Sequence, residues 1–239
     1  MMDDSLFIKV LVVGNSGVGK TSILNQYCYN KFDISVNPTI GCDFCLKVLH
    51  NFEGKTIRLQ LWDIAGLFMI FYRIDLLGQD RYTAVSKLYV KGALGCIVVT
   101  DITSLESLTA SLKWKEVIEE NADFVGNQMI PIVLLQNKSD LLEVQEKKEE
   151  YQDIEYLKSF AEKNNFKASF QVSAKSDVNL EKAIEMLLQE ILKLNILEAS
   201  RDNFRSERPS ESLRLSRFSM PYAEQNNTKD KKDPNKCNC

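Results

Sequence analysis

The sequence predicts an α/β fold, a doubly wound and mostly parallel six-stranded sheet with helices on both faces. Short apolar runs alternate along the chain with longer segments whose apolar residues recur at helical spacing. A glycine-rich stretch, "GNSGVGKTS", separates the first apolar run from the first helical segment. Two successive strand-like runs are joined by only a short turn near Gly54, which indicates one hairpin.

Each element follows from its own pattern. Short runs rich in apolar and β-branched residues predict strands, and these are expected at residues 7–13, 43–49, 56–63, 95–100, 130–136 and 170–173. Apolar residues spaced three and four apart predict helices, which are expected to begin at Lys20 and to span residues 104–120, 151–164 and 180–197. Ser104 is suited to cap its helix, because a serine hydroxyl can accept a hydrogen bond from the first turn.

Composition limits the class of protein. The 239 residues suit one ordinary domain with extra material, and 44% hydrophobic residues can build a core. A net charge of −3 gives no electrostatic footprint for nucleic acid. The chain shows neither a secretory signal nor ~18 consecutive apolar residues, so it is expected to be made in the cytosol. Cys28, Cys42, Cys45 and Cys96 are expected to be reduced core thiols, and the lone His50 an exposed strand-end residue.

The composition changes after about Ala199. Ser, Arg, Asn, Lys and Pro dominate the remaining residues, and hydrophobic periodicity fades. The sequence therefore predicts a folded domain over residues 1–199 and a flexible tail over residues 200–239. The tail reads either as a mere linker or as a tether.

The glycine-rich stretch fits the phosphate-loop pattern G-x-x-x-x-G-K-[ST], between a strand and a helix as that motif requires. Its backbone N–H groups can point at phosphate oxygens, Lys20 adds a positive charge at the β and γ phosphates, and Thr21 can ligate Mg²⁺. The alternative is a chance glycine turn. The expected contacts are Gly14, Asn15, Ser16, Gly17, Val18, Gly19, Lys20, Thr21 and Ser22.

Asp63 and Gly66 form a D-x-x-G motif at the end of the second hairpin strand. Downstream of a phosphate loop, an aspartate in this place is expected to hold Mg²⁺, and the Gly66 N–H to meet a γ phosphate.

Two further loops leave the fifth and sixth predicted strands. In "NKSD" the Asp140 carboxylate can accept hydrogen bonds from the ring N–H and the exocyclic amine of guanine, a donor pair that adenine lacks. In "SAK" the backbone N–H of Ala174 is expected to meet the guanine oxygen. Either motif alone fits an ordinary polar turn. The expected contacts are Asn137, Lys138, Asp140, Ser173, Ala174 and Lys175.

Together these motifs resemble the Ras superfamily of small GTPases, over about Leu6 to Leu197. The resemblance implies a P-loop small GTPase fold, GTP or GDP as the bound nucleotide, Mg²⁺ as cofactor, and hydrolysis of GTP to GDP and phosphate. Asp140 and "SAK" disfavour an ATP-using kinase.

Within that superfamily, "KFDISVNPTIGCDF" is similar to the first switch of Rab proteins. The match implies that Thr39 ligates Mg²⁺ and the γ phosphate, acting with Lys20 in catalysis, and that Phe32 flanks the base. It also implies an effector surface at Phe44, Trp62 and Tyr89, although plain core would place aromatic residues there too. Ile64 in "WDIAG" resembles the subgroup associated with lysosome-related organelles and phagosomes.

The last residues also resemble a Rab protein. "KCNC" matches the doubly geranylgeranylated Rab terminus, with Cys237 and Cys239 as lipid acceptors, and two lipids give stable membrane anchoring. The alternative is a pair of reactive or metal-binding thiols.

The family implies a regulator of vesicle traffic that works with an exchange factor, a GTPase-activating protein, a GDP dissociation inhibitor or escort protein, and effectors. It would lie on the cytoplasmic face of intracellular membranes, with a cytosolic pool.

The chain departs from the Rab pattern after Gly66. In Rab proteins a glutamine that orients the attacking water follows this glycine directly, but here the matching Gln79 comes after a 12-residue insertion, Leu67 to Gly78. A displacement of about 1 Å can slow a reaction ~10²-fold, so the insertion predicts impaired hydrolysis, with Gln79 as a provisional catalytic residue. A non-cycling, GTP-bound scaffold is the alternative function. The segment is apolar and its removal restores "WDIAGQDRY", so a retained in-frame intron would also explain it.

Overall fold

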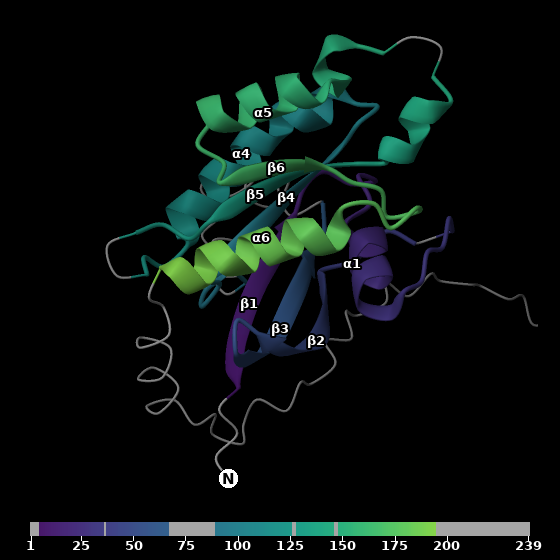
Figure 1. Cartoon of the computed structure of the whole chain (residues 1–239). Helices are drawn as coiled ribbons and strands as arrows, with labels where there is room; N and C mark the ends of the chain where they lie inside the picture. Colours follow the sequence, from purple (N-terminus) through teal and green to yellow (C-terminus); the bar gives the residue numbers. More distant parts are fainter. Residues whose placement is uncertain (1–4, 36, 67–88, 126–127, 146–147, 195–239) are drawn as a thin grey trace, which may run out of the picture.

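The computed structural model describes residues 5–35, 37–66, 89–125, 128–145 and 148–194 (Figure 1). Six strands form one sheet in the order β2-β3-β1-β4-β5-β6, which confirms the predicted fold class. The strands are β1 (Leu6–Val13), β2 (Cys42–Phe52), β3 (Lys55–Ile64), β4 (Gly95–Asp101), β5 (Ile132–Asn137) and β6 (Ala168–Gln171). The helices are α1 (Lys20–Tyr29), α4 (Leu105–Asn121), α5 (Ile154–Lys163) and α6 (Leu180–Lys193), with 3₁₀ turns η1 (Ser139–Glu143) and η2 (Glu150–Gln152).

The sheet is parallel except for its edge strand. β1 pairs in parallel with β3 and β4, and β4, β5 and β6 continue in the same sense. Only β2 runs antiparallel, against β3, as expected for the hairpin. Glu53 and Gly54, at φ 48° and 78°, form the turn, and a glycine accepts this left-handed conformation without steric cost. The parallel strands therefore present their carboxyl ends at one edge of the sheet, where ligands bind in such folds.

The side chains of β1 show how the sheet is covered on both faces. Val10 and Val12 join a core cluster with α1 and α6, whereas Leu11 and Val13 join a second cluster with α4 and α5. Successive side chains of a strand point to opposite faces, so a strand buried on both sides needs a continuous apolar run. Figure 1 shows the two pairs of helices on opposite sides of the sheet.

Several predicted boundaries move. The expected helix at 151–164 is divided, because Asp153 is extended and its carboxylate accepts the N–H of Glu155, so that α5 begins at Ile154. The last strand lies at 168–171 instead of 170–173. Ser104 caps α4 as predicted, accepting the N–H of Ser107 at 3.1 Å. Beyond residue 194 the predicted last helix and the tail lie outside the described residues.

The cysteines correct one prediction. Cys28 of α1 and Cys45 of β2 are joined by a disulfide across a Cα–Cα distance of 6.8 Å, so these two residues are not the reduced thiols expected from the sequence. The sequence could not reveal the pair, because the packing of α1 against β2 brings it together. Cys42 and Cys96 are free, and complete burial raises the pKa of the Cys96 thiol. His50 lies exposed on β2, as predicted.

Candidate functional site

The phosphate loop joins β1 to α1 at the carboxyl edge of the sheet. Gly14 follows the last strand residue, and a Cβ there would lie 2.2 Å from the carbonyl oxygen of Val99. Gly19 precedes α1 at φ 94°, where a Cβ would lie 2.4 Å from Nδ2 of Asn137. The two positions thus require glycine because neighbouring atoms approach too closely for a side chain.

Lys20 is the first residue of α1, directly after this loop, and only 6% of its surface is exposed. Its Nζ donates to the carbonyl oxygens of Gly14 and Asn15 at 2.9 and 3.0 Å. Burial lowers the pKa of Lys20 to about 8, partly opposed by the nearby Asp63 carboxylate. A buried ammonium with two carbonyl acceptors is placed to bind an anion that enters the loop.

Two hydroxyl groups and one carboxylate converge beside Lys20. Thr21 Oγ1 lies 2.5 Å from Oδ2 of Asp63 and 2.9 Å from Oγ1 of Thr39, which itself lies 3.1 Å from the same carboxylate oxygen. Asp63 is 1% exposed, and its Oδ1 has no hydrogen-bond partner among the described residues. A buried carboxylate oxygen without a partner is costly, and hard oxygen donors are the ligands of Mg²⁺. The three side chains therefore fit the expected magnesium site.

Gly66 lies three residues after Asp63 and packs directly on the phosphate loop. A Cβ at this position would lie 2.3 Å from the backbone N of Ser16 and 2.7 Å from the carbonyl carbon of Asn15. The contact holds the D-x-x-G segment against the loop that precedes Lys20. Gln79 and the insertion at residues 67–78 lie outside the described residues.

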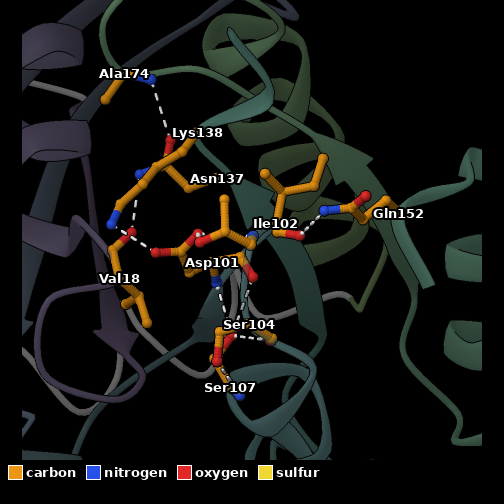
Figure 2. Close-up of polar contacts among 10 residues, drawn as sticks. Val18, Asp101, Ile102, Ser104, Ser107, Asn137, Lys138, Gln152 and Ala174 are labelled. Atoms are coloured by element: carbon orange, nitrogen blue, oxygen red, sulfur yellow. Dashed lines mark hydrogen bonds and ion pairs between the residues drawn. The ribbon is translucent and has the colours of Figure 1, made fainter. Parts of the chain in front are cut away.

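Asn137, at the end of β5, links three segments of the site (Figure 2). Its Nδ2 donates to the carbonyl oxygen of Val18 at 2.9 Å, and its Oδ1 accepts the N–H of Ala174 at 3.1 Å. Its backbone carbonyl accepts the N–H of Ile102 at 2.9 Å. Asn137 therefore ties the phosphate loop to the "SAK" loop, and it already engages the Ala174 N–H that was predicted to meet guanine. A base in this site must share that donor with Asn137.

Asp101 is a site residue that the sequence analysis missed. It ends β4, and its Oδ2 lies 2.5 Å from Nζ of Lys138 (Figure 2). Its other oxygen accepts both the N–H and the hydroxyl of Thr103, at 2.9 and 2.7 Å. The ion pair orients the side chain of Lys138, which belongs to the "NKSD" loop predicted to bind the base. The available signal was the position of Asp101 directly after the buried run "GCIVVT", at the same sheet edge as "NKSD".

Asp140 lies in η1, directly after β5. Its Oδ1 accepts the hydroxyl of Ser173 at 2.7 Å, and its Oδ2 lies 3.9 Å from Nζ of Lys175. The side chain is 14% exposed, so the carboxylate is held in a defined orientation without being sealed from a ligand. The "NKSD" and "SAK" loops are thus brought together, as their strand-end positions predicted.

One cavity of about 690 Å³ connects these groups. A volume of this size is typical of a small-molecule site. Its predicted lining residues are Ser16, Gly17, Gly19, Lys20, Thr21, Ser22, Phe32, Thr39, Gly66, Asn137, Lys138, Asp140, Ala174 and Lys175. Five other predicted contacts do not line the cavity but hydrogen-bond to residues that do, or to their loop: Gly14, Asn15, Val18, Asp63 and Ser173.

Five lining residues were not predicted individually: Asp33, Ile34, Asn37, Pro38 and Leu141. The first four belong to the segment between Phe32 and Thr39, so the match to a first switch already pointed to them. Leu141 directly follows Asp140 and could have been found by extending the "NKSD" motif by one residue.

The three aromatic residues expected to read effectors lie on or beside β2 and β3. Phe44 stacks on Trp62 with 5.5 Å between ring centroids and remains 51% exposed. The Lys9 ammonium also lies 4.4 Å from the ring centroid of Trp62. Trp62 and Tyr89 pack partly buried against the second core cluster, so the predicted surface is also partly core.

The sheet order, the phosphate loop and the two loops beyond β5 and β6 define a P-loop small GTPase. A model of the Ras family matches residues 9–193. Ras-related protein Rab-32 of mouse is 37% identical over 213 residues, which cover 89% of this chain and 83% of the relative. Rab-32A of Dictyostelium discoideum is 37% identical over 190 residues, 79% of each chain. Rat Rab-7L1 is 32% identical over 189 residues, 79% of this chain and 83% of the relative.

The chain therefore belongs to the Ras family and is a Rab-type GTPase, similar to Rab-32 and Rab-7L1. As a member of this family, the chain is a GTPase of membrane traffic. It works with the general classes of regulators and effectors that the family uses. Among the described residues, no helix is long and apolar enough to span a membrane.

Proposed function

We propose that the chain is a membrane-anchored Rab switch whose 690 Å³ cavity binds GTP or GDP with Mg²⁺. One observation carries the proposal. Thr21, Thr39 and the partnerless oxygen of Asp63 converge beside buried Lys20 at one part of the cavity, and Asp140 lines another. The cation ligands and the lysine suit the phosphates of a nucleoside triphosphate, and the carboxylate in the other part of the cavity suits its base.

Each part of the site contributes a separate interaction. The amides of residues 14–22 bind the phosphates, and the N–H of Gly66 meets the γ phosphate. Thr21, Thr39 and Asp63 would hold Mg²⁺, which would neutralise developing phosphate charge when bound. Loss of the γ phosphate would release Thr39 and the first switch, which is how effectors sense the nucleotide.

Base selection rests on Asp140. Ser173 and Lys175 orient its carboxylate, which accepts from the two guanine donors, while Phe32 and the Lys138 stem flank the base. The Ala174 N–H serves the guanine oxygen and Asn137 Oδ1 together.

The membrane part of the proposal concerns residues outside the described structure. In this proposal residues 1–199 contain the GTPase domain, and residues 200–239 serve as a tether geranylgeranylated at Cys237 and Cys239. Similarity to Rab-32 and Rab-7L1 supports action on lysosome-related or phagosomal membranes. The isoleucine of "WDIAG" favours the same location. Phe44, Trp62 and Tyr89 would form part of the effector surface.

A second candidate is a GTP-bound scaffold that recruits partners without efficient hydrolysis. The observation that favours it is the tight contact of Gly66 with Ser16, which fixes one end of the catalytic segment. Gln79 must then return close to Gly66 across 12 inserted residues, so the geometry for water attack is easily lost.

Base selectivity tests the nucleotide site. Asp140→Asn removes the acceptor pair, and we expect GTP affinity to fall at least ~10²-fold while xanthosine triphosphate binding improves. Asp177→Asn is the matched control, because Asp177 is exposed near the same loop at φ 58°, a conformation that asparagine accepts. Unchanged GTP affinity in Asp140→Asn would refute the assignment.

Single-turnover hydrolysis tests the second candidate. The full chain and a variant lacking residues 67–78 are loaded with GTP and compared with and without a GTPase-activating protein. We expect ~10²-fold faster hydrolysis without the insertion. Equal rates would show that Gln79 reaches its place despite the insertion, and sequencing of the transcript shows whether the mature message encodes it.

A further inference from the structure

We propose that Cys28 and Cys45 are a reversible thiol–disulfide site that restrains the first switch. The structure joins the two sulfur atoms, 17 positions apart in the sequence, across the contact between α1 and β2. Cys28 lies in the last turn of α1, the helix that begins at Lys20, and Cys45 lies near the start of β2. The bond therefore closes a loop that contains both Phe32 and Thr39.

The enclosed segment has few other attachments. Between Lys31 and Gly41, most described residues are exposed, including Ile34 at 86% and Ile40 at 88%. Among the described residues, three groups of hydrogen bonds attach it to the rest of the domain: the Lys31 N–H to the Asn25 carbonyl, the Thr39 hydroxyl to Thr21 and Asp63, and the Ala65 N–H to the Gly41 carbonyl. A covalent bond at the base of such a loop reduces the number of open conformations that it can adopt.

The ends of the loop are already held close together without the bond. Lys47, two residues beyond Cys45, donates from Nζ to the carbonyl oxygen of Tyr27 at 2.7 Å, and its ammonium lies 3.6 Å from the Tyr27 ring centroid. This contact keeps β2 beside the last turn of α1 in the reduced protein. The two thiols thus remain neighbours, and closing or opening the disulfide requires no rearrangement of the core.

The two sulfur atoms differ in access. Cys45 is buried at 4% exposure, whereas Cys28 is partly exposed and can meet a small thiol or disulfide from solvent. The Cys28 thiolate attacks glutathione disulfide, forming a mixed disulfide and releasing one glutathione thiolate. The Cys45 thiolate then displaces the second glutathione. Two protein thiols are oxidised, one glutathione disulfide is reduced to two glutathione molecules, and the reverse reaction restores the thiols.

Reversibility follows from the compartment. A chain that acts on the cytoplasmic face of membranes meets a reducing glutathione pool, where a disulfide serves as a transient redox signal more often than as a permanent link. The effect on the switch rests on the proposed nucleotide site, whereas formation of the bond does not.

The bond is tested first by itself. The full chain is equilibrated with glutathione buffers of increasing oxidised fraction, alkylated with iodoacetamide, digested and mapped by mass spectrometry. We expect a peptide cross-linked between Cys28 and Cys45 to appear with oxidation and to vanish on reduction. Alkylation of both residues at every buffer composition would overturn the proposal.

The restraint is tested by release of a fluorescent GDP analogue from the oxidised and reduced chain. We expect release to be severalfold slower in the oxidised chain, a small part of the loop-closure effect for a loop of this size, because the contact of Lys47 with Tyr27 already holds the loop ends together in the reduced chain. Cys28→Ala and Cys45→Ala should each abolish the redox dependence, while Cys42→Ala, in the same strand but outside the bond, should retain it. Equal release rates despite a mapped cross-link would refute the restraint, and failure of every form to bind the analogue would instead contradict the proposed nucleotide site.

Discussion

Gly66→Ala is the perturbation whose magnitude the structure defines best. A Cβ at position 66 would lie 2.3 Å from the backbone N of Ser16 and 2.7 Å from its Cα. Ordinary van der Waals contact begins at 3.4 Å, and the neighbouring atoms are backbone that cannot rotate away. The phosphate loop or the D-x-x-G segment must therefore move by about 1 Å, and a shift of that size at a reacting centre costs ~10²-fold.

The assay compares the dissociation constants of GDP and of a non-hydrolysable GTP analogue, together with single-turnover hydrolysis. In the proposed site the Gly66 N–H meets the γ phosphate, so we expect the affinity for the GTP analogue to fall ~10²-fold and the affinity for GDP to fall much less. Gly54→Ala is the control, because Gly54 lies in the hairpin turn away from the cavity with nothing within 4 Å of its Cβ position, so its cost is limited to the positive φ of 78°. Twofold or smaller changes in Gly66→Ala would refute the reasoning.

Three further outcomes are expected. The pKa of Lys20 is about 8 in the free protein and should rise towards 10.5 when phosphates enter, so GTP affinity should fall above pH 8 and binding should take up protons. Calorimetry at pH 8.5 in two buffers of different ionisation enthalpy checks this, and no proton uptake would contradict it. Asp101→Asn removes the charge partner of Lys138 and should speed GDP release several-fold in a stopped-flow assay, whereas an unchanged rate would show that the pair is not used. Trp114→Phe removes the donor to Asn15 Oδ1, a bond of 2.9 Å, and should lower the free energy of unfolding by ~1 kcal/mol in urea titration; an unchanged stability would refute it.

The sequence was sufficient to predict those candidate site residues that lie in short motifs at the ends of strands. The run "GNSGVGKTS" carries its own turn chemistry. Asp63 and Asn137 lie at the ends of strands that the apolar pattern identifies, and Asp140 lies just beyond one. Since parallel strands end at one edge, their positions alone predicted that these residues meet.

The remaining features depend on distances between elements. The partnership of Asp101 with Lys138 requires the register of β4 against β5, in which Asp101 lies opposite Asn137. The Cys28–Cys45 bond depends on how α1 packs on β2. The N–H of Ala174 was assigned to guanine because the motif gives no sign that Asn137 Oδ1 lies 3.1 Å away. Local sequence contains none of these separations.

The nucleotide carried by the purified chain tests the central claim most directly. The full-length protein is purified in Mg²⁺ buffer, denatured, and its released nucleotides are identified and quantified by chromatography. The cavity lined by Lys20, Thr21 and Asp140 predicts close to one guanine nucleotide per chain, as GDP or GTP, and its loss on prolonged chelation of Mg²⁺. Release of adenine nucleotide, or of none from a folded chain, would contradict the account.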